Sequence, residues 1–227
     1  MNDYVLNNLN AVRGEVAVAE RAVGREGKTL LLAATKYADA NELAALVGAG
    51  IAAVGENRVQ QLLEHYPVFE NSGVSVHFIG SLQTNKVKYI ADKVEMIHSI
   101  DSVRLAAEVE KQAAKHSRSI AVLVEINAAR EESKSGVLPE QVVALCREIL
   151  QMPHLHLAGF MTMGSVMESD DAYRAYFTHV REMCYGFWRE LGIEGTPILS
   201  MGMSQSFAAA IAAGADIVRV GRRLFAH

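Results

Sequence analysis

The chain has 227 residues, of which 50% are hydrophobic, and this length and composition predict one large domain with a sizeable core. Its formal net charge of −4 at pH 7 provides no strong attraction to nucleic acid or to an anionic membrane, so neither is expected as a partner.

The two cysteines, Cys146 and Cys184, lie far apart and match no disulfide or metal-binding spacing, so both are expected to be reduced thiols in the core. The N-terminal segment has an early acidic residue and lacks the apolar run of a secretory signal. The longest uncharged stretch, residues 202–215, is too short and too rich in small residues to span a bilayer. We therefore expect a soluble cytoplasmic protein.

Short apolar runs alternate with longer helical patterns along the chain, beginning with a helix predicted over residues 3–23. Strands are predicted near residues 30–35, 51–54, 75–79, 95–99, 120–126, 156–161, 197–200 and 216–220. Helices are predicted between the strands, beginning near Asn41, Glu56, Asn85, Ser102, Pro139, Asp171 and Ser204. Pro139 suits the first position of a helix, and Gly50 and Gly214 suit the turns that follow helix ends.

Eight strands that alternate with helices predict a parallel sheet, either an open doubly wound sheet or a closed (β/α)8 TIM barrel. Eight units in slightly fewer than the ~250 residues typical of such barrels favour the barrel. No low-complexity linker interrupts the pattern, so residues 1–227 are predicted to form a single domain with an extra N-terminal helix.

A lysine follows the first predicted strand on the face of its apolar residues. Leu30, Leu32 and Ala34 share one face because strand side chains alternate, and Lys36 continues that face. On this evidence alone, a solvated lysine just beyond a strand is the commoner explanation. The alternative is a lysine whose amine takes part in chemistry.

The last predicted strand carries Arg219 on the same face as Ile217, and an arginine that points into a core needs acceptors. In a closed barrel the first and last strands are neighbours, so Lys36 and Arg219 would meet at the C-terminal mouth, where such barrels place their sites. Repulsion between two cations favours the neutral amine, which is the form that attacks a carbonyl group. This proximity favours the chemical role for Lys36.

Two glycine-containing turns follow the seventh and eighth predicted strands, at residues 200–204 and at Gly221. Glycine lets backbone N–H groups approach an anion, and Ser204 is expected to cap the helix that follows. Barrels frequently bind phosphate at these two loops. A plain turn between a strand and a helix would also explain the pattern, and the position opposite Lys36 favours the phosphate site.

Polar residues also follow the second and third predicted strands. Asn57 either hydrogen-bonds a substituent of a ligand ring or opens the next helix, and Asn85 is expected to cap the helix after the third strand. His154 and His156 alternate on one strand face, but no third ligand lies nearby, so a structural or exposed role is expected rather than a metal site.

Several motifs are distributed along nearly the whole chain. They are the Lys36 strand, GEN at 55–57, HFIGSLQTNK at 77–86, HSID at 98–101, ESKSG at 132–136, SMGMS at 200–204 and AAIAAGADIVRVG at 209–221. In this order they resemble the pyridoxal phosphate homeostasis proteins, the YggS/PROSC family, which is related to the N-terminal barrel of alanine racemases. The resemblance implies a fold-type III barrel that holds pyridoxal 5'-phosphate (PLP) covalently on Lys36 as a Schiff base.

The resemblance also implies roles for five further residues. Arg219 faces the pyridine nitrogen and Asn57 lies beside the ring, whereas the phosphate is held by Ser200, Gly221 and Arg222.

Three segments depart from the family pattern. The family usually has two acidic residues where Gln205 and Ser206 stand, and Ile-Phe-Gly where residues 224–226 read Leu-Phe-Ala. It commonly has a threonine at the position of Arg222. This arginine either makes a charged contact to phosphate in place of a hydroxyl contact or points away.

The preferred function is a PLP-binding protein of PLP homeostasis that is not an enzyme with efficient turnover. An arginine at the pyridine nitrogen leaves that nitrogen unprotonated and weakens the ring as an electron sink. The alternative, a PLP-dependent amino acid racemase, needs an acid/base on each face of the substrate carbon. The related racemases take one from a second domain, whereas this chain stops just after its eighth strand.

A third function, a Schiff-base aldolase without cofactor, does not explain the glycine-rich turns beside Arg219. The expected partners are PLP and PLP-dependent apo-enzymes, and a monomer is expected.

Overall fold

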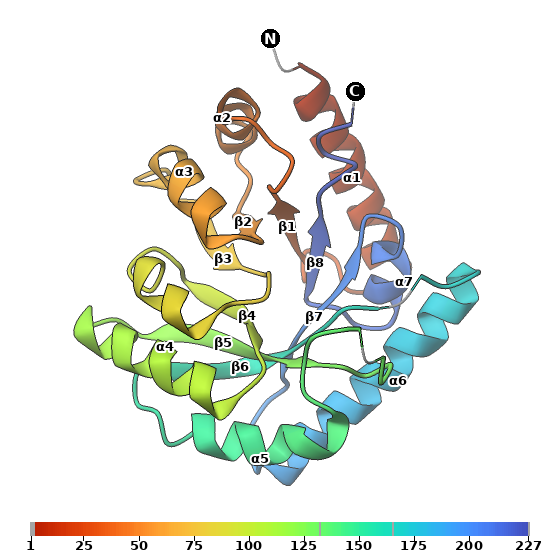
Figure 1. Ribbon diagram of the computed structural model, residues 1–227. Coiled ribbons are helices and arrows are strands. Elements are labelled where there is room, and N and C mark those ends of the chain that lie inside the picture. The colour runs from red at the N-terminus through yellow and green to blue at the C-terminus, as the bar shows by residue number, and fades with distance from the viewer. Residues whose placement is uncertain (1–2, 132, 165, 227) are drawn as a thin grey trace.

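The computed structural model describes residues 3–131, 133–164 and 166–226. Parallel strands alternate with helices and close into a barrel, because each strand pairs with the next one along the chain and β8 pairs with β1 (Figure 1). The strands are β1 (Leu30–Ala34), β2 (Ala53–Glu56), β3 (Ser75–Phe78), β4 (Met96–Ile100), β5 (Ile120–Ile126), β6 (Leu155–Thr162), β7 (Ile198–Met203) and β8 (Ile217–Val220). The predicted (β/α)8 barrel is confirmed.

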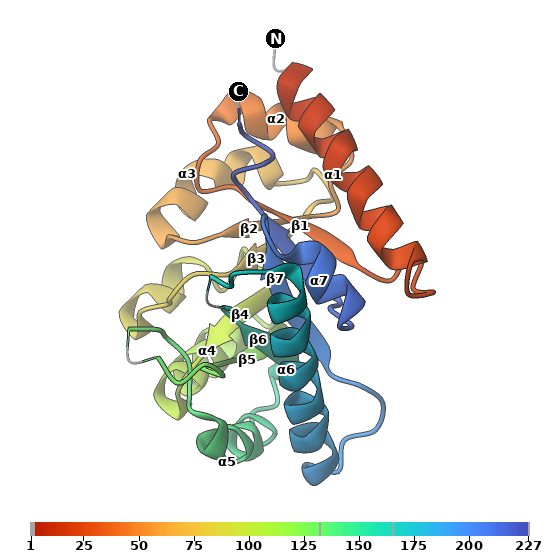
Figure 2. The same ribbon diagram turned by 90° about the vertical axis from the view of Figure 1, so that its right-hand side faces the viewer.

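The helices cover the outside of the barrel, and the extra helix α1 lies along it beside α7 and α2 (Figure 2). The helices are α1 (Asp3–Arg21), α2 (Ala40–Gly48), α3 (Val59–Phe69), the short 3-10 helix η1 (Thr84–Tyr89), α4 (Val103–Lys115), α5 (Pro139–Ile149), α6 (Asp170–Glu190) and α7 (Phe207–Ala212). Within the described ranges, none of them has the length and apolar character needed to cross a membrane.

Helix α1 is attached to the barrel by an apolar stripe and by one amide. Val5, Leu9, Val12 and Val16 recur at intervals of three and four residues, so they share one face, and all four are buried. The side-chain amide of Asn8 donates hydrogen bonds to the carbonyl oxygens of Leu224 (3.3 Å) and Ala226 (2.9 Å). The first helix therefore holds the segment that follows the last strand.

Several sequence signals for helix ends are confirmed. Pro139 is the first residue of α5, and Gly50 and Gly214 have positive φ angles of 68° and 101° after α2 and α7.

Cys146 in α5 and Cys184 in α6 are both buried free thiols, as predicted. Burial raises the pKa of Cys146 to about 12, so this thiol stays protonated.

One predicted helix start and one predicted helix cap are wrong, whereas the helix predicted near Asn85 is present as η1. Glu56 does not begin a helix but ends β2, where its buried carboxylate accepts a hydrogen bond from the Thr35 hydroxyl (2.6 Å) and meets Nδ1 of His65 (2.7 Å). The buried Thr35 and the half-buried His65 thus hold this acidic side chain at the end of a strand. Asn85 does not cap a helix, because it lies inside η1, and Gln83 stands at the cap position without a side-chain hydrogen bond.

The two histidines that alternate near β6 have different surroundings. Nδ1 of His154 lies 2.7 Å from Oε1 of Glu110, and His156 is exposed. Across the part of the chain that the structure describes, no group of three metal-ligating side chains comes together.

The interior of the barrel contains two small apolar clusters. Leu32, Ala34 and Ile217 belong to the cluster near β1 and β8, whereas Leu123 and Met161 belong to the cluster near β5 and β6. Leu30, Leu32 and Ala34 thus share one face of β1, as predicted, and this face points into the barrel. Lys36 follows on from it at the end of the strand.

A row of buried polar side chains shares this interior, and its members are His77, His98, Ser200 and Arg219. Polar groups inside a barrel need partners from within the barrel, and these residues find them in one another.

Candidate functional site

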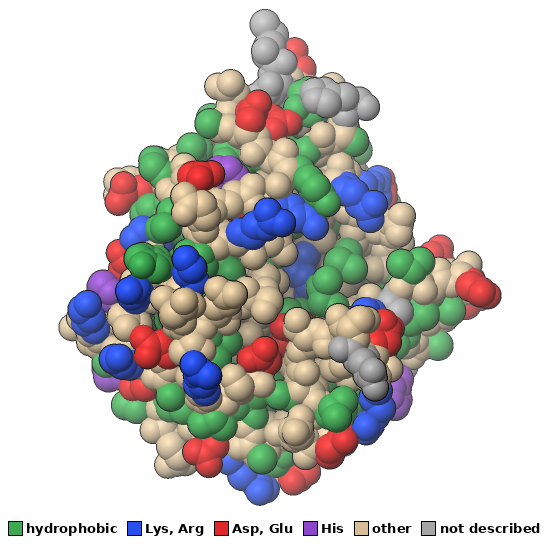
Figure 3. Space-filling view, viewed as in Figure 1, with side chains coloured by type: hydrophobic (Ala, Val, Ile, Leu, Met, Phe, Trp, Pro, Cys, Tyr) green, Lys and Arg blue, Asp and Glu red, His purple; other side chains and the backbone are tan. Residues whose placement is uncertain are grey.

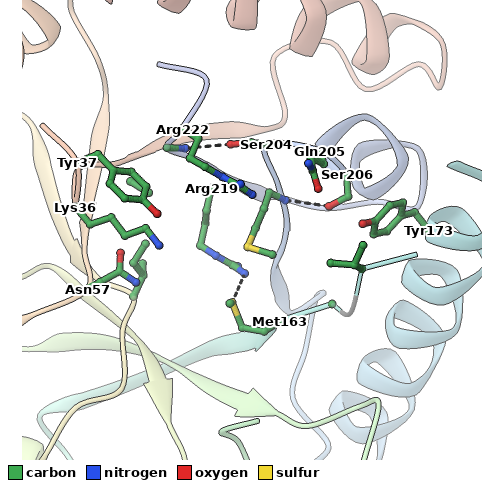
Figure 4. Close-up of a pocket in the computed structure, with 16 residues that line it drawn as sticks. Lys36, Tyr37, Asn57, Met163, Tyr173, Ser204, Gln205, Ser206, Arg219 and Arg222 are labelled. Carbon is green, nitrogen blue, oxygen red and sulfur yellow. Dashed lines mark hydrogen bonds between the residues drawn. The ribbon is translucent and has the colours of Figure 1, made fainter. Parts of the chain in front are cut away.

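A cavity of about 180 Å³ opens at the C-terminal mouth of the barrel. Figure 3 shows Lys and Arg side chains beside a hollow near the centre of this face. Five of the six predicted site residues line the cavity, and they are Lys36, Asn57, Arg219, Gly221 and Arg222 (Figure 4). The remaining lining residues are Ala34, Tyr37, Ile79, Met163, Gly164, Val166, Tyr173, Met203, Ser204, Gln205 and Ser206.

Lys36 stands two residues beyond β1, in an exposed turn. Its backbone carbonyl accepts a hydrogen bond from the side-chain amide of Gln61 (3.0 Å), which anchors the turn to α3. The side chain points into the cavity, and Nζ lies 4.8 Å from the ring centroid of Tyr37 (Figure 4). The amine is therefore directed into the cavity and accessible from it.

Arg219 forms part of the floor of the cavity and is buried, with only 4% of its surface exposed. One Nη donates to the Ser200 hydroxyl (2.7 Å), and the other donates to the Thr162 carbonyl (3.0 Å) and contacts Sδ of Met163 (3.5 Å). Burial lowers the pKa of Arg219 to about 10, against an opposing effect of the Glu125 carboxylate. The guanidinium therefore remains charged at neutral pH.

Ser200 lies beneath the cavity rather than in its lining. Its hydroxyl accepts a hydrogen bond from Arg219 and lies 3.0 Å from Nδ1 of His98, so it is engaged within the barrel interior. Ser200 therefore lies close to the predicted phosphate site, but its hydroxyl group binds Arg219 and does not face the cavity.

Ser204 lines the cavity but does not cap α7, in contrast to the prediction. The helix begins three residues later, at Phe207, and Ser206 occupies the cap position. The Ser204 hydroxyl instead accepts a 3.4 Å hydrogen bond from the backbone N–H of Gly221, and the Ser206 hydroxyl accepts one from Met203 N–H (3.2 Å). The bond between Gly221 and Ser204 joins the loops that follow β7 and β8 at one side of the cavity, and the bond between Met203 and Ser206 closes the turn at the end of β7 (Figure 4).

Two glycines make this junction possible. Gly202 has a φ of 90°, and a Cβ on it would lie 2.5 Å from the Cβ of Ala210. A Cβ on Gly221 would lie 3.0 Å from the backbone oxygen of Ala34 in β1. Arg222 follows on the exposed rim, and its side chain extends along the cavity without a carboxylate partner among the described residues (Figure 4).

Asn57 carries a buried polar atom that lacks a partner. Its Oδ1 is inaccessible to solvent and accepts no hydrogen bond from the residues that the structure describes. Leaving such an oxygen unpaired costs about 1–3 kcal/mol, which a donor in the cavity would recover. The helix-opening role is not observed, because α3 begins at Val59 with Arg58 at its cap position.

Comparisons with known proteins match nearly the whole chain. Residues 8–227 match the model of the family described as alanine racemase, N-terminal domain. The pyridoxal phosphate homeostasis protein of Aquifex aeolicus is 41% identical over 206 residues, which cover 91% of this chain and 90% of that protein. The protein of the same name from Escherichia coli K12 is 33% identical over 230 residues, with coverages of 99% and 97%.

Solved structures give the same picture. PipY of Synechococcus elongatus with PLP bound has a TM-score of 0.81 and 25% identity, covering 92% of this chain and 99% of PipY. PipY without PLP has a TM-score of 0.86 at 25% identity, with coverages of 97% and 99%. An alanine racemase of Clostridium difficile has a TM-score of 0.74 at 16% identity, and the match covers 99% of this chain but 57% of the racemase, which shows a shared fold.

One acidic residue near the site has no counterpart in the motifs that the sequence analysis identified. Glu125 on β5 is buried, with 5% of its surface exposed. Burial, together with the nearby Asp101, raises the pKa of its carboxyl group from 4.5 to about 7, against the opposing effect of Arg219. A carboxyl group inside an apolar strand gives no periodic signal, so only the closed barrel reveals that Glu125 lies near enough to Arg219 for their charges to interact.

We predict that Glu125 makes the stability of the protein fall as pH rises. Between pH 4.5 and about 7 the folded protein binds more protons at this site than the unfolded chain does, so the free energy of unfolding decreases across that window. Relative to Glu125→Gln, which does not titrate, the wild type should lose roughly 2–3 kcal/mol between pH 4.5 and pH 8. Urea unfolding at a series of pH values measures this difference.

Glu148→Gln, the same chemical change at an exposed position of α5, is the matched control and should retain the pH profile of the wild type. Parallel profiles for wild type and Glu125→Gln would contradict the prediction.

Proposed function

Because the chain belongs to the family of pyridoxal phosphate homeostasis proteins, within the wider alanine racemase N-terminal domain family, we propose that it binds PLP and takes part in intracellular PLP homeostasis. One observation carries the proposal to this chain. The cavity at the mouth of the barrel combines the accessible amine of Lys36, the buried charge of Arg219 and the unpartnered Oδ1 of Asn57.

The lining of the cavity suits each part of this cofactor. PLP, when bound, supplies an aldehyde that condenses with a primary amine, together with a pyridine ring and a phosphate. In our proposal Lys36 is the amine that holds it covalently, and Asn57 offers its oxygen to a donor beside the ring. Arg219 offers N–H groups to the ring nitrogen from below.

The phosphate belongs, in this proposal, at the junction of the loops after β7 and β8. Gly221 lines the cavity there, and Gly202, with its positive φ, shapes the loop that leads to Ser204. Arg222 contributes a positive charge from the exposed rim, and it forms no ion pair with the acidic residues that the structure describes, so it is available to a phosphate. Ser200 acts from beneath through Arg219, whereas Ser204 provides the hydroxyl group at the cavity surface.

We further propose that the protein holds PLP without efficient turnover. Arginine only donates hydrogen bonds, so a pyridine nitrogen opposite Arg219 accepts one and stays unprotonated. An unprotonated ring is a weak electron sink for the carbanions that racemisation and transamination require. The relatives are named homeostasis proteins, which agrees with a role in holding the cofactor.

The remaining parts of the proposal concern the setting of this activity. We propose that the chain acts as a single-domain monomer in the cytoplasm and that PLP-dependent apo-enzymes receive the cofactor. The exposed turn of Lys36 supports such a transfer, because an incoming amine can reach the covalent bond from solvent.

We predict that borohydride fixes PLP on Lys36. Reduction followed by peptide mass mapping should locate the adduct on this residue, because its amine points into the cavity. Lys36→Ala should lose the visible absorption band of bound PLP while its unfolding transition remains cooperative. Lys86→Ala is the matched control, since Lys86 lies on the exposed face of η1, and it should retain the band. An adduct found only on Lys86 or Lys134 would refute the assignment.

We predict that the phosphate makes a large contribution to binding. Pyridoxal, which lacks the phosphate, should bind at least about tenfold more weakly than PLP, a loss that corresponds to roughly 1.4 kcal/mol or more. Equilibrium dialysis or absorbance titration measures both affinities. Arg222→Ala should reduce this preference, whereas equal affinities of the unchanged protein for the two compounds would show that the glycine turns are purely structural.

We predict little amino acid turnover by the PLP-loaded protein. Incubation with L-alanine and other L-amino acids in deuterated water should give Cα exchange far below about 1 s⁻¹, the lower end of ordinary enzyme rates. Arg219→Glu should increase the exchange, because a carboxylate favours the protonated ring. Exchange at enzyme-like rates in the wild type would restore the racemase alternative. A variant that binds PLP but gains no exchange would refute the electronic argument.

A further inference from the structure

A continuous row of hydrogen bonds crosses the interior of the barrel and ends at Arg219. Its members come from β3, β4, β7 and β8. The distances are 3.0 Å from the Ser75 hydroxyl to Nε2 of His77, 2.9 Å from Nδ1 of His77 to Nε2 of His98, 3.0 Å from Nδ1 of His98 to the Ser200 hydroxyl, and 2.7 Å from that hydroxyl to Nη of Arg219. The proposed binding of PLP gives no role of its own to His77 or His98.

Both imidazole rings are neutral at pH 7. Burial lowers the pKa of His77 to about 4. Burial, helped by the charges of His77 and Arg219, lowers the pKa of His98 well below its usual value. Each ring therefore has one N–H donor and one lone-pair acceptor. It accepts a hydrogen bond from one neighbour in the row and donates one to the other, so all the bonds run in the same direction.

Arg219 sets that direction, because a guanidinium can only donate. Ser200 accepts from Arg219, and its own proton finds an acceptor in Nδ1 of His98. His98 then carries its proton on Nε2 and donates to Nδ1 of His77, which in turn donates from Nε2 to Ser75. In the opposite direction the buried Ser200 proton would have no acceptor among the described residues, which is unfavourable.

We propose that His98 and His77 are positioning residues for Arg219, which they hold, through Ser200, as a charged donor aimed at the cavity. This inference rests on the proposed binding of PLP. The row lines up its bond dipoles so that oxygen and nitrogen lone pairs face the guanidinium, and aligned hydrogen bonds strengthen one another. Three of the five N–H groups of Arg219 have partners in the barrel, which fixes its plane. The other two have no partner among the residues that the structure describes and remain for a ligand.

The direction of the row can be tested in the protein without any ligand. Long-range 1H–15N correlation spectra of protein labelled with 15N-histidine distinguish protonated from unprotonated ring nitrogens. We expect Nε2 to be protonated and Nδ1 to be unprotonated in both rings, assigned with the His77 and His98 variants. A proton on Nδ1 of either ring at pH 7 would overturn the proposal.

A pair of substitutions at His98 tests the effect on Arg219. His98→Leu removes both ring nitrogens, whereas His98→Asn places an amide oxygen near the position of Nδ1 and can still accept from Ser200. We expect PLP to bind about tenfold more weakly to His98→Leu, the effect of losing one charge-assisted hydrogen bond. His98→Asn should stay within about threefold of the wild type.

An analogue of PLP with carbon in place of the ring nitrogen distinguishes a loss of Arg219 orientation from a general disturbance of the binding site. Because it offers no acceptor to Arg219, its affinity should be nearly the same for wild type and His98→Leu. Equal losses for PLP and the analogue would overturn the proposal, since a merely structural effect weakens both. If His98→Leu does not fold, Ser200→Ala removes the link next to Arg219 and should show the same dependence on the ring nitrogen.

The two proposals fail separately. A wild-type protein that takes up no PLP on Lys36 would refute the proposed function, and the nitrogen spectra would still decide the direction of the row. A wild type that binds PLP, with equal losses for the two ligands in the variants, would refute only the positioning role.

Discussion

A guanidinium group buried inside a barrel would destabilise the folded protein by several kcal/mol if it had no hydrogen-bond acceptors. The interior of this barrel supplies them. Arg219 forms no ion pair within the described residues; a serine hydroxyl, a backbone carbonyl and a sulfur atom accept its protons instead. Neutral acceptors leave the positive charge uncancelled. A carboxylate in direct contact would neutralise it. Glu125, the acidic residue whose charge acts on Arg219, itself has a pKa raised to about 7.

The closure of the barrel turns this buried charge into part of a site. Strands β1 and β8 pair in register, with Leu32 opposite Arg219, so the turn that carries Lys36 stands beside the same mouth. Gly221 fits against the backbone of Ala34 across that seam, where a larger residue would push the strands apart. The amine, the guanidinium and the glycine loop thus owe their proximity to one pair of strands.

The sequence carried enough information for the fold and for most of the cavity lining. Alternating strand and helix patterns determine the barrel, and the ends of its strands bring Lys36, Asn57 and Arg219 together as expected. The errors concern polar residues whose partners are distant in sequence. The sequence pattern at Glu56 predicts a helix start, because its hydrogen bonds to Thr35, just after β1, and to His65 of α3 exist only in the folded barrel. Ser200 lies beneath the cavity because of the depth at which β7 holds it inside the barrel, and the sequence does not show that depth.

The seam between β1 and β8, secured by Asn8 of the first helix on the segment after the last strand, has a consequence for synthesis of the chain. Contacts between the two ends of a sequence form late, because long loops must close first, and they slow folding. Until the ribosome releases the final strand, β1 has an unpaired edge, and the lysine has no arginine beside it. A nascent chain that lacks β8 therefore carries Lys36 without the cavity that this residue lines together with Arg219. The proposed capture of PLP at this lysine would have to wait until β8 has paired with β1.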